Sequence, residues 1–293
     1  MRTMSRTSKF SYTKFHGLGN DFIVTNGRNL SGDLNALAQS ICEAHTGVGA
    51  DGLLVVQKPR STTNHARVRF FNADGSEAEM SGNGIRCVGA FLMRENPRRK
   101  RLRVETASGV KILELLSTSA QGKQGKWNFR VNMGRPILDP LKIPFLAGKH
   151  PAPVVGYPIR THQGVLAATI TSMGNPHCSI IVEDFANLPW ESIGREIERN
   201  PLFPNRTNVE FVRVISKREI EVRYWERGVG KTMSSGTGSC GAVVACILNG
   251  FTRRSVKVRT LAGTLEVTWP EDKEVLLAGP AELITDGVYY PPR

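Results

Sequence analysis

The stretch Asn72–Phe91, NADGSEAEMSGNGIRCVGAF, is a turn-rich segment that leads into a largely apolar run. Ser81 stands directly before Gly-Asn-Gly, and apolar residues then recur at helical spacing, which predicts a helix that begins just after the serine. A second stretch, Glu226–Gly250, ERGVGKTMSSGTGSCGAVVACILNG, places Ser235 before Gly-Thr-Gly and ends on Asn-Gly. The two matched helix starts predict two similarly folded halves.

Most of the remaining sequence consists of short β-branched or aromatic runs bounded by Gly, Asp, Asn or Pro, which predict strands. Further helices are expected in 34–47 and 187–200. The helix after Ser81 is apolar nearly all round, so strands should surround it. The segment 136–153, rich in proline and glycine, is interpreted as a linker. We expect the two halves to face each other, with a site in the cleft between them.

Composition narrows the class of protein. With 40% hydrophobic and 22% charged residues among 293, the chain suits a soluble two-domain protein. It lacks both the run of about 18 apolar residues of a membrane span and the apolar core of a signal peptide. Five scattered cysteines without a CxxC pair indicate neither a disulfide framework nor a zinc cluster, and favour the cytoplasm. Much of the +13 net charge lies in Arg94–Arg103; with no aromatic residue interleaved, we interpret this run as a solvated loop rather than a nucleic-acid surface.

Each serine alone is best explained as an N-cap. Two helix N-termini directed at one site would also offer N–H donors to a carboxylate or to an enolate-like charge. Glu226 and Arg227 could hold an ammonium and a carboxylate, or form an exposed ion pair. No dinucleotide fingerprint or metal-ligand spacing occurs, so no cofactor is expected. Four asparagines, each beside Gly or Pro or in a polar loop, could bind a small molecule or only make turns: Asn20, Asn72, Asn175 and Asn208.

Six motifs resemble those of the diaminopimelate epimerase family, in order and rough spacing, from about Lys14 to Pro280. They are FHGLGNDFIV, GVGADGLLVV, FNADGSEAEMSGNGIRC, SMGNPHC, NVEF and ERGVGKT followed by GTG. The resemblance implies an α+β fold of two pseudo-symmetric domains, each a strongly curved, mostly antiparallel sheet wrapped around a central helix. We place the domains at 1–133 with 278–293, and at 134–277. The resemblance also implies cofactor-free interconversion of LL- and meso-diaminopimelate for lysine and peptidoglycan synthesis, by a cytoplasmic homodimer.

In that family one cysteine removes the α-proton as a thiolate, and a second delivers a proton to the opposite face as a thiol. The matching positions here are Ser81 and Ser235, which is the largest departure from the family pattern. A second departure is Lys231, where the family commonly has Glu. Cys87 and Cys240 do not take over, since their positions fall inside the helices. The resemblance implies these substrate-binding positions: Asn20, Asn72, Gly82, Asn83, Asn175, Asn208, Glu226, Arg227, Gly236 and Thr237.

An alcohol has a pKa far above that of a thiol, and a gap of roughly five units adds on the order of 7 kcal/mol to forming the base. Three accounts stay open: a site-substituted protein that captures substrate, a natural relative whose reaction has changed or vanished, or activation of one serine by Lys231 or His177. The alternatives to an amino-acid epimerase are a same-fold isomerase or lyase acting on another small carboxylic acid, and a non-catalytic ligand-binding protein.

Overall fold

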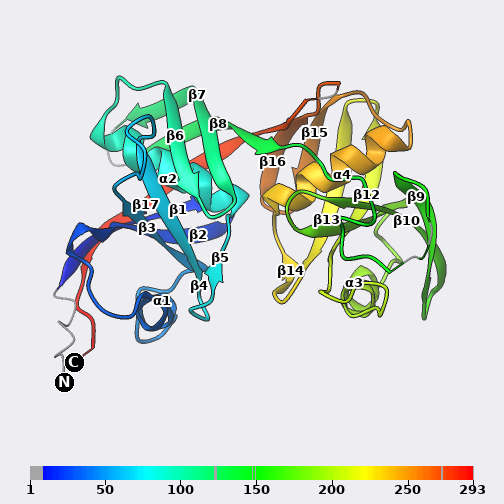
Figure 1. Cartoon of the computed structure of the whole chain (residues 1–293), viewed down its shortest axis with the longest axis horizontal. Coiled ribbons are helices and arrows are strands. Elements are labelled where there is room, and N and C mark those ends of the chain that lie inside the picture. Colours follow the sequence, from blue (N-terminus) through cyan, green and yellow to red (C-terminus); the bar gives the residue numbers. More distant parts are fainter. Residues whose placement is uncertain (1–8, 122–123, 147, 149, 272, 293) are drawn as a thin grey trace. The chain divides into compact units, whose positions relative to one another are not determined.

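The computed structural model describes residues 9–121, 124–146, 148, 150–271 and 273–292. The chain divides into two compact units, Met1–Val131 with Gly279–Arg293, and Asn132–Ala278. Figure 1 labels most of the helices and strands of both units. None of the helices in the described ranges is long and apolar enough to cross a membrane.

Unit 1 is a ring of strands around helix α2 (Gly82–Glu95). The strands pair in the order β1–β2–β3–β4–β6–β7–β8–β17, and β17 pairs with both β8 and β1, which closes the ring. All pairs with a determined direction are antiparallel except β2–β3 and β4–β6, and β5 adds to β4. The strands are β1 (Phe10–Gly17), β2 (Asn20–Asn26), β3 (Gly52–Gln57), β4 (Ala66–Asn72), β5 (Glu77–Ala78), β6 (Arg101–Thr106), β7 (Gly109–Gln121), β8 (Gln124–Gly134) and β17 (Val275–Tyr289).

Helix α2 is buried on almost every side, because strands surround it. Its glycines permit this close packing: a Cβ on Gly89 would lie 2.8 Å from Cδ2 of Leu113 and 3.0 Å from Cζ of Phe129. The shorter helix α1 (Leu34–Cys42) begins at its N-cap Asp33 and buries one apolar face that includes Ile41. A 3-10 turn, η1 (Gly27–Asn29), follows β2.

Unit 2 has a similar order of strand pairs, β9–β10–β11–β12–β13–β15–β16–β17, around helix α4 (Gly236–Leu248). As in unit 1, the chain forms an outer helix between two parallel strands: α3 (Trp190–Glu198) connects β11 to β12. The central helix α4 lies, in chain order, between the strands of a second parallel pair, β13 and β15. The expected pair of similarly folded α+β halves, each wrapped around a central helix, is thus confirmed. The strands are β9 (Val154–Thr161), β10 (Gly164–Ser172), β11 (Pro176–Val182), β12 (Asn208–Ser216), β13 (Glu219–Glu226), β14 (Gly230–Thr232), β15 (Ser255–Thr260) and β16 (Gly263–Thr268).

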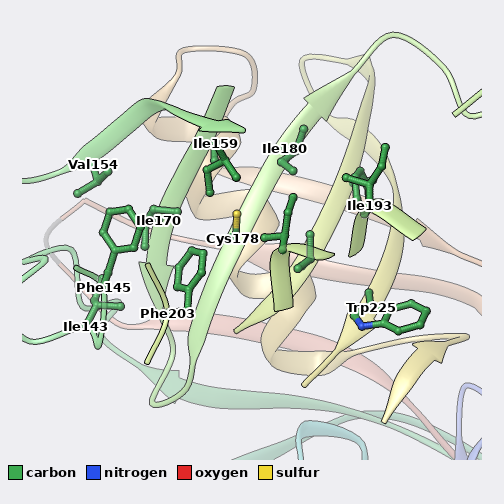
Figure 2. Packing of buried hydrophobic residues seen from close by; sticks show 14 residues of the cluster. Ile143, Phe145, Val154, Ile159, Ile170, Cys178, Ile180, Ile193, Phe203 and Trp225 are labelled. Carbon is green, nitrogen blue, oxygen red and sulfur yellow. The ribbon is translucent and has the colours of Figure 1, made fainter. Parts of the chain in front are cut away.

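The interpretation of residues 136–153 as a linker is wrong. Ile143 and Phe145 are buried in the hydrophobic cluster of unit 2, where the Phe145 ring lies 5.0 Å from that of Phe203 (Figure 2). Ile137 also forms an antiparallel bridge with Ser172. The prolines keep this segment out of regular secondary structure, but the apolar residues between them pack into the hydrophobic core of unit 2.

Candidate active site

Ser81 and Ser235 are both N-caps, with nearly the same geometry. Ser81 has φ −123° and ψ 129°, and its Oγ accepts the N–H of Gly84 at 3.1 Å. Ser235 has φ −129° and ψ 127°, and its Oγ accepts the N–H of Gly238 at 3.2 Å. The structural role predicted for each serine is therefore confirmed. Both hydroxyl groups lie at a helix N-terminus, where N–H groups and the helix dipole favour negative charge.

A carboxylate lies beside Ser235. The Ser235 hydroxyl donates to Oε2 of Glu226 at 2.8 Å, and Thr232 donates to Oε1 of the same group at 2.7 Å. Burial raises the pKa of Glu226, although the two hydroxyl donors and nearby His177 act against that rise. A carboxylate with a raised pKa is a stronger proton acceptor than an ordinary one, and here it sits within reach of a hydroxyl proton.

His177 is the centre of a buried network under the first turn of α4. Its Nδ1 lies 2.7 Å from Oε1 of Glu210, and its Nε2 lies 3.0 Å from Oδ1 of Asn175. Asn175 in turn donates to the Thr237 hydroxyl at 3.5 Å. A Cβ on Gly241 would lie 3.0 Å from Cγ of His177, so this glycine lets the imidazole pack against α4. The network joins three of the predicted residues, and it adds Glu210, which sequence reasoning missed.

The side chain of Asn208 holds the backbone of Arg227. Asn208 donates to the carbonyl of Pro176 at 2.9 Å, and its Oδ1 accepts the backbone N–H of Arg227 at 3.0 Å. Asn208 is buried, whereas the Arg227 side chain is exposed and donates to the carbonyl of Asn205. These contacts fix the end of β13 while leaving the guanidinium accessible. Glu226 and Arg227 do not pair with each other in the described hydrogen bonds and ion pairs.

Glu198 of α3, which was not predicted, holds the turn after Glu226. Its buried carboxylate accepts the indole N–H of Trp225 at 2.9 Å and the backbone N–H of Gly228 at 2.9 Å. Burial opposes ionisation of Glu198, but these donors and the charges of Arg206 and Arg199 prevail and lower its pKa. Glu198 directly follows Ile197 and lies to one side of the stripe formed by Ile193 and Ile197, so the helical spacing gave no signal for it.

In unit 1 the polar residues meet at the first turn of α2. Asn83 donates to Oδ1 of Asn20 at 3.2 Å, and Asn20 donates to Asp51 at 2.6 Å. Fully buried Arg86 donates to Oδ1 of Asn83 at 2.8 Å, which orients that amide. Burial, followed by the charge of nearby Asp21, raises the pKa of Asp51. Sequence reasoning missed both Asp51 and Arg86.

Asn72 stands apart from this group. Its side chain is exposed and donates to the hydroxyl of Ser76 at 2.9 Å, as part of the turn that joins β4 to β5. Gly82 and Gly236 are the first residues of the two central helices, and both are buried.

Lys231 points toward α3. Its Nζ lies 2.8 Å from Oε1 of Glu191 and 5.6 Å from the centre of the Trp190 ring, in a pair that is half exposed on both sides. The nearest charged partner of Ser235 among the described contacts is Glu226, so the geometry favours Glu226 over Lys231 as a proton acceptor. Cys87 and Cys240 are buried inside the helices, and burial raises the pKa of Cys87 to about 12. No cluster of three or more His, Cys, Asp or Glu side chains able to hold a metal occurs in the described part of the chain.

The sequence model of the family described as "Diaminopimelate epimerase" matches residues 12–138 and 169–284. A diaminopimelate epimerase of Pelotomaculum thermopropionicum is 46% identical over 282 residues, which cover 95% of this chain and 98% of that protein. The chain belongs to the diaminopimelate epimerase family. A second member, from Halothermothrix orenii, is 43% identical over 281 residues, with 95% of this chain and 97% of that protein covered.

Solved structures place the same fold beyond the family. A hydroxyproline epimerase from Agrobacterium vitis superposes with a TM-score of 0.70 at 12% identity, covering 98% of this chain and 94% of that one. A methylitaconate-delta-isomerase superposes with a TM-score of 0.64 at 15% identity, covering 98% of this chain and 96% of that one. At these identities the likeness establishes the fold alone. Within the diaminopimelate epimerase family, this chain carries serine at both predicted proton-transfer positions.

Proposed function

We propose that this protein is a diaminopimelate epimerase that interconverts the LL and meso isomers by proton transfer at Cα, with Ser81 and Ser235 at the two proton-transfer positions. The observation that carries the proposal is the matched pair of serine N-caps, with the same backbone conformation and the same Oγ-to-N–H contact in both units. The extent and identity of the matches to named diaminopimelate epimerases supply the substrate. They favour diaminopimelate over another small carboxylic acid.

The chain's own groups suit the charges of this reaction. First-turn N–H groups around Gly82, Asn83, Gly236 and Thr237 would bind the substrate α-carboxylate and the charge that forms on it when the α-proton leaves. The exposed guanidinium of Arg227 would bind the distal carboxylate, while Asn20, Asn72, Asn175 and Asn208 would donate or accept hydrogen bonds. No step requires a metal or an organic cofactor.

Proton transfer through serine is expected to be slow. A gap of roughly five pKa units between an alcohol and a thiol costs on the order of 7 kcal/mol, or about 10⁵-fold in rate. Glu226 recovers part of this cost on one side, because it already accepts a hydrogen bond from the Ser235 hydroxyl and could take its proton. His177 supports the site by orienting Asn175, and Lys231 acts only through its ion pair with Glu191.

We also propose that the protein acts as a cytoplasmic homodimer in lysine and peptidoglycan synthesis, since the family resemblance implies this setting. Size-exclusion chromatography with light scattering tests the dimer. A mass of one chain at micromolar concentration would remove that part of the proposal.

The test of the reaction is α-proton exchange from LL-diaminopimelate in heavy water. The Ser81→Cys/Ser235→Cys double variant should exchange about 10⁵-fold faster than the serine protein. Ser234→Cys is the matched control, because it adds a thiol one residue from the cap and should leave the rate unchanged. A double variant that folds and binds diaminopimelate but exchanges no faster would refute the assigned proton-transfer positions.

A further inference from the structure

A separate group of reactive side chains lies on the exposed face of α3. His162, in the turn between β9 and β10, has its Nδ1 2.6 Å from Oε2 of Glu196. Its Nε2 lies 3.4 Å from Oγ of Ser192. Ser192 and Glu196 are four residues apart on the helix, so they share one face and contact the two nitrogens of the same imidazole. The order serine, imidazole, carboxylate is that of a nucleophile, its base and the group that orients the base.

Glu196 fixes the orientation of the histidine. Besides the contact to Nδ1, both carboxylate oxygens accept the backbone N–H of His162, at 3.1 and 3.2 Å. The imidazole bond is the main cause of the lowered pKa of Glu196, so the carboxylate is ionised and acts as an acceptor. An ionised acceptor at Nδ1 places the ring proton there, which leaves Nε2 as a base facing Ser192.

The surroundings supply room and donors. These residues line an open groove of about 640 Å³ on the surface of unit 2. Ser192 lies in the first turn of α3, whose N-cap Pro189 has no side-chain bond to the helix. The Trp190 N–H already donates to the carbonyl of Leu188 at 2.7 Å, so the first-turn N–H groups of Glu191 and Ser192 are the ones that could bind a developing oxyanion. Ser192 donates to the carbonyl of Pro189 at 2.9 Å in the resting state, and rotation about its Cα–Cβ bond would turn the proton toward His162.

The charge of the groove indicates the kind of substrate. Arg195 and Arg199 line it on the same helical face as Ser192. The carboxylates in the groove are already engaged, Glu191 by Lys231 and Glu196 by the histidine. The two guanidiniums therefore favour a substrate that carries a negative charge.

We propose that Ser192, His162 and Glu196 form a second catalytic site, an esterase site for small esters that carry a carboxylate. Oγ of Ser192 attacks the ester carbonyl carbon while its proton passes to Nε2 of His162. The bond to the alcohol oxygen then breaks, and the alcohol leaves with that proton. Water hydrolyses the acyl-serine by the same proton route, so the products are a carboxylic acid and an alcohol, with no redox change.

A fluorophosphonate probe tests for the activated serine, because it forms a stable phosphonyl-serine and releases fluoride. We expect labelling of Ser192, located by peptide mapping, at least about 10²-fold faster than labelling of exposed Ser119, the range that general-base assistance provides. Ser192→Ala should abolish this label, and His162→Ala should reduce it to the rate of Ser119. Labelling of Ser192 that is unchanged in His162→Ala, or absent from the intact protein, would overturn the proposal.

Turnover gives a second readout. Hydrolysis of p-nitrophenyl esters should be faster for the hemisuccinate than for the acetate, and Arg199→Gln should remove that preference. Glu196→Gln should lower the rate and Glu196→Asp should restore part of it. Ser119→Ala and His150→Ala are the surface controls and should change nothing. Equal rates of ester hydrolysis by the intact protein and by Ser192→Ala would contradict the assignment. The rate of α-proton exchange on diaminopimelate, in contrast, should be the same in the intact protein and in Ser192→Ala.

Discussion

Replacing Glu198 by alanine removes a buried carboxylate that joins α3 to the turn after β13. Three hydrogen bonds are lost: two of 2.9 Å, from the Trp225 indole and the Gly228 backbone, and one of 3.4 Å from the exposed guanidinium of Arg206. Each bond to a charged group contributes about 1.5–3 kcal/mol, while alanine relieves the cost of burying a charge. The buried indole N–H then lacks its acceptor, whereas the exposed Gly228 N–H can bond to water. We expect a net loss of about 3 kcal/mol in the free energy of unfolding.

Urea unfolding monitored by tryptophan fluorescence measures this loss. Glu191→Ala is the control on the same helix, since it removes a half-exposed ion pair and should cost less than about 0.5 kcal/mol. A loss for Glu198→Ala as small as that of the control would refute the proposed anchoring role. Binding of diaminopimelate should weaken as well, because Gly228 is two residues from Glu226 in the same turn.

The effect of Glu198 should depend on pH. Its pKa in the folded protein is lowered from the ordinary value of 4.5, because the donors and nearby arginines outweigh the cost of burial. A depressed pKa contributes stability above the unfolded value, and this contribution is lost as pH falls through the folded pKa. The difference in unfolding free energy between the intact protein and Glu198→Ala should therefore become smaller below about pH 4. A difference that grows in acid would contradict the cause given for the shift.

Ser81→Ala and Ser235→Ala each remove one N-cap acceptor, so each should lower the unfolding free energy by about 1 kcal/mol in urea titrations; an unchanged midpoint would show that water replaces the cap. Burial raises the pKa of Glu226, so its stabilising contribution is present below its ordinary value of 4.5 and is lost as pH rises through the folded pKa. Glu226→Gln should make the unfolding free energy less dependent on pH between 4.5 and the folded pKa, and an unchanged pH dependence would contradict burial as the cause of the shift. Arg86→Leu leaves three buried acceptors without their donor and should cost about 3–5 kcal/mol, a loss that a native-like Tm would exclude.

The helices after Ser81 and Ser235 could be predicted from local signals alone. A serine before Gly-x-Gly, followed by apolar residues at helical spacing, specifies both the cap and the buried helix within a few residues of sequence. Strand β17 could not be predicted in this way. It contains Gly-Pro and Asp-Gly pairs that normally mark turns, yet it runs from Val275 to Tyr289, because pairing with strands far away in sequence outweighs the local preference.

The site shows the same division. The predicted asparagines, Glu226 and Arg227 lie in sequence motifs, and so does Arg86, but the motifs do not show which groups position which. Arg86 reaches the carbonyl of Pro280 and Glu198 reaches Trp225, contacts that only the folded chain creates. The proposed Ser192 group likewise depends on a turn that lies thirty residues earlier in the chain. These partners are far apart in the sequence, so local residue spacing does not predict that they meet.

The most direct test of the central claim is the stereochemical course of exchange in single-cysteine variants. In heavy water, Ser81→Cys and Ser235→Cys each place one thiol in the site, so each should exchange the α-proton mainly with retention, from the one isomer whose α-proton faces that thiol. The double variant should exchange and invert together, at about 10⁵ times the rate of the serine protein. Inversion by one single-cysteine variant at the rate of the double variant would contradict a mechanism that uses both positions.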